Sequence, residues 1–137
     1  MRVGTPPILQ MASLDAALDV WDDVDLDDVR ARSIELSEIF ISEVETSCPE
    51  VSLASPRAPE NRGSQVGLRF EHGYAAMQAL IARGVIGDFR APDIMRFGFT
   101  PLYLTKGEVR EAARILADII ATRAWDNPDF QRKDTVT

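Results

Sequence analysis

Apolar and polar residues follow each other along the chain with two different periods, which predict four helices and four short strands. In the helical segments an apolar residue recurs every three or four positions, so that apolar side chains gather on one side of a helix. The expected helices cover about residues 6–21, 26–46, 74–83 and 105–122. The strand-like segments are 51–55, 65–70, 85–89 and 94–99. This order indicates an α+β fold, a small and mostly antiparallel sheet with helices packed on one face.

Each predicted helix has an apolar stripe that we expect to face the core. The expected inward-facing residues are Leu14, Leu18 and Trp21 in the first helix, Val29, Ser33, Leu36, Phe40 and Val44 in the second, Tyr74, Met77 and Ile81 in the third, and Val109, Ala112, Ala113, Leu116 and Ile120 in the last. Gly84 follows the third helix and suits the C′ position, which favours a residue with positive φ.

Polar segments divide the chain into a leading helix, a small domain and a tail. Residues 5–22 are expected to form a helix that leads into a small domain of about 26–125, and the acidic residues between them favour a turn. The tail, 126–137, is polar and expected to fray. The loop "PRAPENRGS" separates two strands that could pair as a hairpin, and the segment 65–99 is long enough for a crossover connection.

Composition limits the classes of protein to consider. A chain of 137 residues has the length of one domain, and its net charge of -7 argues against nucleic acid or an anionic membrane as a partner. The single cysteine and single histidine argue against a zinc or thiolate metal site, and no metal site is predicted. No apolar run approaches the roughly 20 residues that cross a bilayer, and the start lacks a signal-peptide pattern, so a cytoplasmic location is expected.

Arg96 is the strongest candidate for a functional residue. In a strand, Ile94, Arg96 and Gly98 share one face, while Met95 and Phe97 share the other. Gly98 leaves room beside the guanidinium, whose planar fork suits a carboxylate ligand, and a buried cation needs such a partner. The alternative is an arginine on the wet side of a half-exposed sheet. Arg90, in the preceding loop, is expected to be solvated or ion-paired.

Thr5 has two readings of the same kind. A threonine before Pro6 and Pro7 is a good helix N-cap and needs no further explanation. A hydroxyl at a helix N-terminus is also a place where a phosphate can bind, because the exposed amides and the helix dipole favour an anion.

The remaining chemically reactive residues do not form a catalytic set. His72 lies in a predicted turn without a matching acid and nucleophile, and Cys48 ends a helix as an inert thiol. The two lysines, Lys106 and Lys133, do not have the apolar surroundings that a Schiff-base amine needs. From the residues alone, two classes stay open: a ligand-binding or subunit-interaction domain, and part of an enzyme whose chemistry lies elsewhere.

Four segments together give a more specific indication. They are "RVGTPPIL", "LASPRAPENRGSQVGLRF", "GYAAMQALIARGVIGDFRAPDIMRFGFTPLY" and "ILADIIATRAW". In this order and spacing the chain, from Arg2 to about Phe130, resembles the C-terminal third of kynureninase. That family uses pyridoxal 5'-phosphate (PLP) and has the fold-type I architecture of aspartate aminotransferase. The resemblance implies hydrolysis of L-kynurenine, or of its 3-hydroxy derivative, to anthranilate (or its 3-hydroxy form) and L-alanine in the kynurenine pathway of tryptophan catabolism.

The resemblance also implies roles for two residues. Arg96 stands at the position that binds the substrate α-carboxylate in a bidentate clamp. Thr5 stands at the position that contacts the cofactor phosphate from the partner subunit of a homodimer. No catalytic residue and no metal ligand is carried over to this chain.

The departures from the family pattern are as informative as the match. The chain lacks the lysine of the internal aldimine, the aspartate for the pyridine nitrogen and the large parallel-sheet domain. We therefore expect a fragment, a proteolytic remnant or a truncated reading frame that neither holds PLP tightly nor turns over substrate alone. Two alternatives remain: the small domain of another fold-type I PLP enzyme, such as a class-V aminotransferase or cysteine desulfurase, and a free-standing interaction module.

Overall fold

A computed structural model describes residue 4 and residues 7–132 of the chain. The helices are α1 (Ile8–Leu18), α2 (Leu26–Ser47), α3 (Gly73–Ala82), α4 (Lys106–Ala121) and α5 (Pro128–Gln131), with 3-10 turns at Asp19–Trp21 and Pro59–Asn61. The strands are β1 (Ser52–Leu53), β2 (Gln65–Arg69), β3 (Asp88–Arg90) and β4 (Ile94–Gly98). The strand predicted at 85–89 therefore begins three residues later, and the one predicted at 51–55 is shorter.

The sheet has the strand order β1-β2-β4-β3, and every neighbouring pair is antiparallel. Since β2 and β3 both run antiparallel to β4, they are parallel to each other, and α3 connects them as a crossover with β4 inserted between. The predicted hairpin of β1 with β2 and the predicted crossover are both confirmed. The α+β fold class is confirmed as well.

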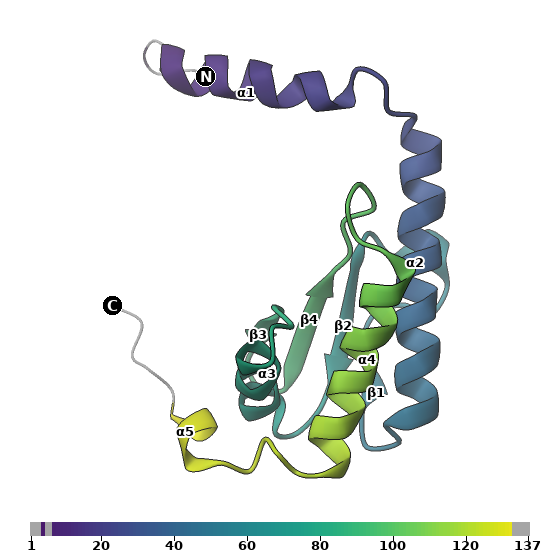
Figure 1. Cartoon of the computed structure of the whole chain (residues 1–137), viewed down its shortest axis with the longest axis vertical. Coiled ribbons are helices and arrows are strands. Elements are labelled where there is room, and N and C mark those ends of the chain that lie inside the picture. Colours follow the sequence, from purple (N-terminus) through teal and green to yellow (C-terminus); the bar gives the residue numbers. More distant parts are fainter. Residues whose placement is uncertain (1–3, 5–6, 133–137) are drawn as a thin grey trace.

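The core lies between the sheet and a layer formed by α2, α3 and α4 (Figure 1). Alternation along β2 and β4 sends Val66, Leu68, Met95 and Phe97 into this layer. The ring centroids of Phe97 and Phe40 of α2 lie 4.9 Å apart. The predicted stripes of α2 and α4 are buried except at their margins, where Val29 and Ala112 are half-buried.

The stripe predicted for α3 is only partly correct. Met77 is buried, but Tyr74 is half-buried and Ile81 is exposed. The core side of this helix is formed mostly by small residues, because α3 lies close to the sheet. Its buried residues are Gly73, Ala75, Ala76, Met77, Ala79 and Leu80. Alanine carries little hydrophobic signal, so a pattern search weights the larger side chains instead.

Two helix ends follow the expected chemistry. Thr105 caps α4: its hydroxyl accepts a hydrogen bond from the Glu108 amide, and the Glu108 carboxylate accepts one from the Thr105 amide. Gly84 follows α3 with a φ of +83°, a conformation in which a side chain would be strained. These two signals place the ends of α3 and α4 within one or two residues of the predicted limits.

The first helix projects away from the rest of the domain (Figure 1). None of the residues of α1 is buried, so the predicted stripe of Leu14, Leu18 and Trp21 has no partner within the described chain. The helix begins at Ile8 after Pro7, two residues later than predicted, and Thr5 and Pro6 lie outside the described residues. The prediction that this stripe faces a core is therefore not met among the described residues.

The prediction of a frayed tail is wrong for residues 126–132. They include α5, whose Asn127 side chain caps the helix by accepting a hydrogen bond from the Asp129 amide. Phe130 packs against the core, and the Tyr74 hydroxyl donates to the Arg132 carbonyl at 2.8 Å. Phe130 and this long-range hydrogen bond connect an otherwise polar segment to the rest of the domain.

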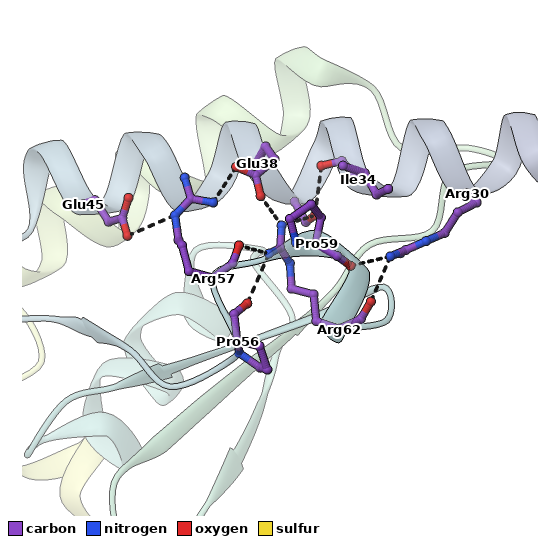
Figure 2. A network of polar contacts seen from close by, with 9 residues as sticks. Arg30, Ile34, Glu38, Glu45, Pro56, Arg57, Pro59 and Arg62 are labelled. Carbon is purple, nitrogen blue, oxygen red and sulfur yellow. Dashed lines mark hydrogen bonds and ion pairs between the residues drawn. The ribbon is translucent and has the colours of Figure 1, made fainter.

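A cluster of arginines and glutamates fastens the loop between β1 and β2 to α2 (Figure 2). Arg62 has a side chain that is only 3% exposed; it forms an ion pair with Glu38 and donates to the carbonyls of Pro56 and Arg57. Arg57 also pairs with Glu38, at 2.6 Å. On the same side, Arg30 of α2 donates to the carbonyls of Pro59 and Arg62. The loop is thus held from both directions.

Glu38 is the carboxylate on which this cluster depends. Burial raises its pKa, but the hydrogen bonds from Arg57 and Arg62 and their charges lower it by more, so the pKa lies below its usual value of 4.5. A carboxyl group whose pKa falls on folding stabilises the fold above its unfolded pKa, and this contribution is lost as the pH falls through the folded pKa.

We predict that Glu38→Gln lowers the free energy of unfolding at pH 7 by about 2 kcal/mol, because the buried Arg62 loses its counter-charge while the partly exposed site limits the loss. The same variant should flatten the loss of stability below about pH 4.5. Urea unfolding at several pH values measures both effects. Glu43 lies on α2, as Glu38 does, and forms an exposed ion pair with Arg110 of α4. Glu43→Gln should therefore change the free energy of unfolding by less than about 0.5 kcal/mol. Equal effects of the two substitutions would contradict the role of Glu38.

Candidate functional site

The sheet face opposite the helices carries most of the charged side chains of the strands. We call it the open face; its residues point away from the core by strand alternation. Two rows cross it. One row consists of Ser52, Arg69, Ile94 and Arg90, and the next of Gly67, Arg96 and Asp88. Arg96 thus lies at the centre of the open face, with β2 on one side and β3 on the other.

Arg96 lies on the face that the strand pattern predicts, with Ile94 and Gly98, but it is not buried as expected. Its side chain is 29% exposed, because the helices cover only the other face of the sheet. Within the guanidinium, Nε is buried and has no hydrogen-bond partner among the described residues. The terminal nitrogens are therefore the part of the fork that a ligand would meet.

Asp88 is the partner of Arg96 within the chain. The two residues lie directly opposite each other in the antiparallel pair of β3 and β4, and Arg96 Nη2 donates to Asp88 Oδ2. Arg90 approaches the same oxygen, with its Nε at 3.3 Å, and this bears out the expected ion pair of Arg90. The hydrogen bond from Arg96, assisted by the charge of Arg90, holds the pKa of Asp88 below its usual range.

Two glycines are the neighbours of Arg96 on the open face. Gly67 is the cross-strand neighbour of Arg96 on β2, and a Cβ there would lie 3.4 Å from Ser55 Oγ. Gly98 lies two residues along β4 on the same face, and a Cβ there would meet no atom within 4 Å. The surface is therefore open at Gly98, and at Gly67 it is bordered by Ser55. The arrangement offers a cation with a free approach, and this suits a small anion such as a carboxylate.

The other candidate residues lie elsewhere. Lys106 Nζ forms an ion pair with Glu35 at 2.5 Å in the first turn of α4. His72 stacks on Trp125, with ring centroids 4.0 Å apart, and burial raises the pKa of the Cys48 thiol. Thr5 and Lys133 lie outside the described residues. Among the described residues, no hydrogen bond or ion pair joins Lys106, His72 or Cys48 to Arg96, so these three side chains are not assigned to its site.

A separate cleft of about 350 Å³ lies between α3, the β3–β4 turn and the C-terminal segment. It is lined in part by His72, Tyr74, Phe89 and Trp125 and does not include Arg96. Within residues 4 and 7–132, no three His, Cys, Asp or Glu side chains are grouped as metal ligands would be. In the same part of the chain, no helix has the length and apolar character to cross a bilayer.

Sequence reasoning missed Asp88. It lies eight positions before Arg96 in the sequence. The predicted strand 85–89 begins three residues before the observed β3 (Asp88–Arg90), so the pattern does not place Asp88 opposite Arg96. The register of β3 against β4 brings the two residues opposite each other. The sequence did carry one signal, the motif "GDFR", in which a charged pair follows a glycine at a strand end.

We predict that Arg96→Gln raises the pKa of Asp88 toward its usual value near 3.8, because the hydrogen bond from Arg96 is the largest cause of its low pKa. Carboxyl-carbon NMR titration of the chain measures this shift. Glu111 provides the control, since its pKa is lowered by Arg114 on another surface and should not change. An unchanged pKa of Asp88 would contradict the pairing.

Comparison with known proteins agrees with the resemblance seen in the motifs. The family described as the kynureninase C-terminal domain matches residues 29–116. Kynureninases of Burkholderia mallei (strain SAVP1) and Pseudomonas fluorescens are each 46% identical over 136 residues, which is 98% of this chain. The chain spans about a third of these relatives, since the matched part is 33% of their length.

A solved structure, a NifS-like protein, has the same fold at 15% sequence identity. Its TM-score is 0.73, and the match covers 88% of this chain and 36% of that protein. The expected fold, that of the C-terminal domain of fold-type I PLP enzymes, is thereby confirmed. Since the family match extends over more than half of the residues, the chain belongs to the kynureninase family and carries its C-terminal domain.

Proposed function

We propose that this chain is the part of a kynureninase that binds the substrate α-carboxylate, and that Arg96 is the residue that binds it. The complete enzyme would hydrolyse L-kynurenine to anthranilate and L-alanine. The observation that carries the proposal is the position of Arg96, at the centre of the open face with its terminal nitrogens accessible and two glycines beside it. The 46% identity to kynureninases supports this substrate class.

The electrostatics of the site match a single carboxylate. Arg96, Arg90 and Asp88 together have two positive charges and one negative charge, which leaves a net charge of +1. A carboxylate would neutralise this cluster and accept hydrogen bonds from the terminal nitrogens of Arg96. Holding the carboxylate fixes the orientation of the substrate Cα bonds, a contribution to catalysis by positioning.

PLP is proposed as the cofactor of the complete enzyme, but the described residues do not fit its site. The amine that would carry it has no candidate among them, because Lys106 is held by Glu35 at the surface. When bound, the group supplies an electron sink for cleavage of the Cβ–Cγ bond of the substrate. The rest of a kynureninase, the two thirds that this chain does not match, would hold the group and supply the reacting side chains.

Three further features belong to the same proposal. Thr5 would contact the cofactor phosphate from the partner subunit of a homodimer. The exposed apolar residues of α1 are consistent with a helix that is covered in the complete protein. A place in tryptophan catabolism follows from the proposed substrate. A cytoplasmic location is part of the same proposal, and neither nucleic acid nor a membrane is proposed as a partner.

The alternative of a cysteine desulfurase or class-V aminotransferase rests on the fold. The NifS-like protein shares that fold at 15% identity, whereas kynureninases share 46% of the residues over nearly the whole chain. The motifs around Arg96 are part of the segment matched by the kynureninase family. The kynureninase proposal is therefore the better supported of the two.

A chimera tests the proposal directly. We predict that Pseudomonas fluorescens kynureninase, with its matched third replaced by residues 1–137, hydrolyses L-kynurenine. Arg96→Lys in this chimera keeps the charge but loses the fork, and should lower kcat/KM by about 10- to 100-fold with little change in stability. Anthranilate fluorescence measures turnover, and Arg114→Lys on the far side of α4 is the control.

Unchanged kinetics of Arg96→Lys would show that another residue binds the carboxylate. A well-folded chimera that holds PLP but does not hydrolyse kynurenine would contradict the assigned reaction.

We also predict that the 137-residue chain alone, mixed with PLP and kynurenine, releases no anthranilate above the rate of free PLP. The reason is that the described residues provide no amine placed to carry the cofactor. The same fluorescence assay measures this, with the complete Pseudomonas fluorescens enzyme as the positive control. Clear turnover by the chain alone would contradict the proposal that the rest of a kynureninase holds PLP and supplies the reacting side chains.

A further inference from the structure

We propose that Asp88 is the positioning residue of the substrate-carboxylate site: it holds the Arg96 guanidinium in place on the open face for the incoming carboxylate. The inference rests on the proposed function, since it assigns a role within the same site. It adds Asp88, a residue to which the family resemblance assigns no role.

The two strands beside Arg96 differ in what they offer its side chain. Arg96 has a long, flexible side chain, and on the side of β2 its neighbour Gly67 provides no side chain to hold it. On the side of β3, Asp88 lies directly opposite and accepts a hydrogen bond from Nη2. The buried Nε has no partner, so among the described residues this hydrogen bond is the polar contact that fixes the guanidinium.

Asp88 is itself held by two arginines. Its carboxylate accepts from Arg96 and also lies 3.3 Å from Arg90 Nε, on the same strand. Asp88 therefore joins two guanidinium groups that would otherwise repel each other across the strand pair. Because the cluster keeps a net charge of +1, Asp88 orients Arg96 without cancelling its attraction for an anion.

The alternative is that Asp88 competes with the substrate carboxylate for Arg96. The two roles make opposite predictions for KM, because a competitor raises KM and its removal lowers it. A positioning residue lowers KM, and its removal raises KM while the chemistry of the bound substrate changes little.

The kinetic test uses the chimera described above. Asp88→Ala should raise KM for kynurenine about tenfold and change kcat by less than about twofold, as expected for the loss of one charge-assisted hydrogen bond. Asp88→Asn keeps an oxygen that can accept from Arg96 and should raise KM only about threefold. Asp93→Ala, which removes a similar pair with Arg69 on the same face, should leave KM unchanged.

A second test does not depend on turnover. In the 137-residue chain, the buried Arg96 Nε–H should be rigid on the nanosecond timescale, and ¹⁵N relaxation should show it clearly more mobile in Asp88→Ala. The Arg69 Nε–H is the control within the same sample and should not change.

The outcomes separate the two proposals. An unaltered or lower KM in Asp88→Ala, or an Arg96 Nε–H that stays rigid in that variant, would overturn the role of Asp88 and leave the assigned reaction intact. Should Asp88→Ala fail to fold, the KM of Asp88→Asn decides in the same way. A chimera that binds PLP without hydrolysing kynurenine contradicts the reaction, and the relaxation measurement then still decides on Asp88.

Discussion

The structure depends on the register of β4 between β2 and β3. This register sends Met95 and Phe97 into the helical layer, where they pack with Phe40 and Leu68, and it sends Arg96 to the opposite face. A slip by one residue would exchange the two faces and bury the guanidinium in the core. The same pairing that forms the core therefore also fixes the position of the candidate site.

The two faces of the sheet have different roles as a consequence. The covered face supplies stability through apolar contacts and through the fastening of the β1–β2 loop by Glu38 and Arg62 (Figure 2). The open face has little to pack against among the described residues and instead carries a charged row with a net positive centre. A site on a rigid sheet, supported from behind by a packed core, holds its groups more precisely than a loop does.

The sequence predicted the long helices, the hairpin and the facing of Arg96, because these follow from periodicities of 3.6 and 2. The predictions failed where the structure depends on contacts between segments that are distant in the sequence. The apolar residues of α1 have no core to pack against among the described residues, and periodicity alone does not reveal this. The position of α5 depends on the packing of Phe130 against the core. The partnership of Arg96 with Asp88 depends on strand register, which short strands joined by a turn do not reveal. Family motifs identified the arginine, but only coordinates identified its neighbour.

Arg96 is proposed to bind the carboxylate of an amino acid, and the position of that carboxylate in a ligand complex decides whether it does. A crystal structure of the active chimera with a non-hydrolysable kynurenine analogue would give that position. We expect the α-carboxylate oxygens to lie within about 3 Å of the terminal nitrogens of Arg96, with the ion pair between Arg96 and Asp88 retained. A carboxylate bound to another residue, with Arg96 directed into solvent, would contradict it.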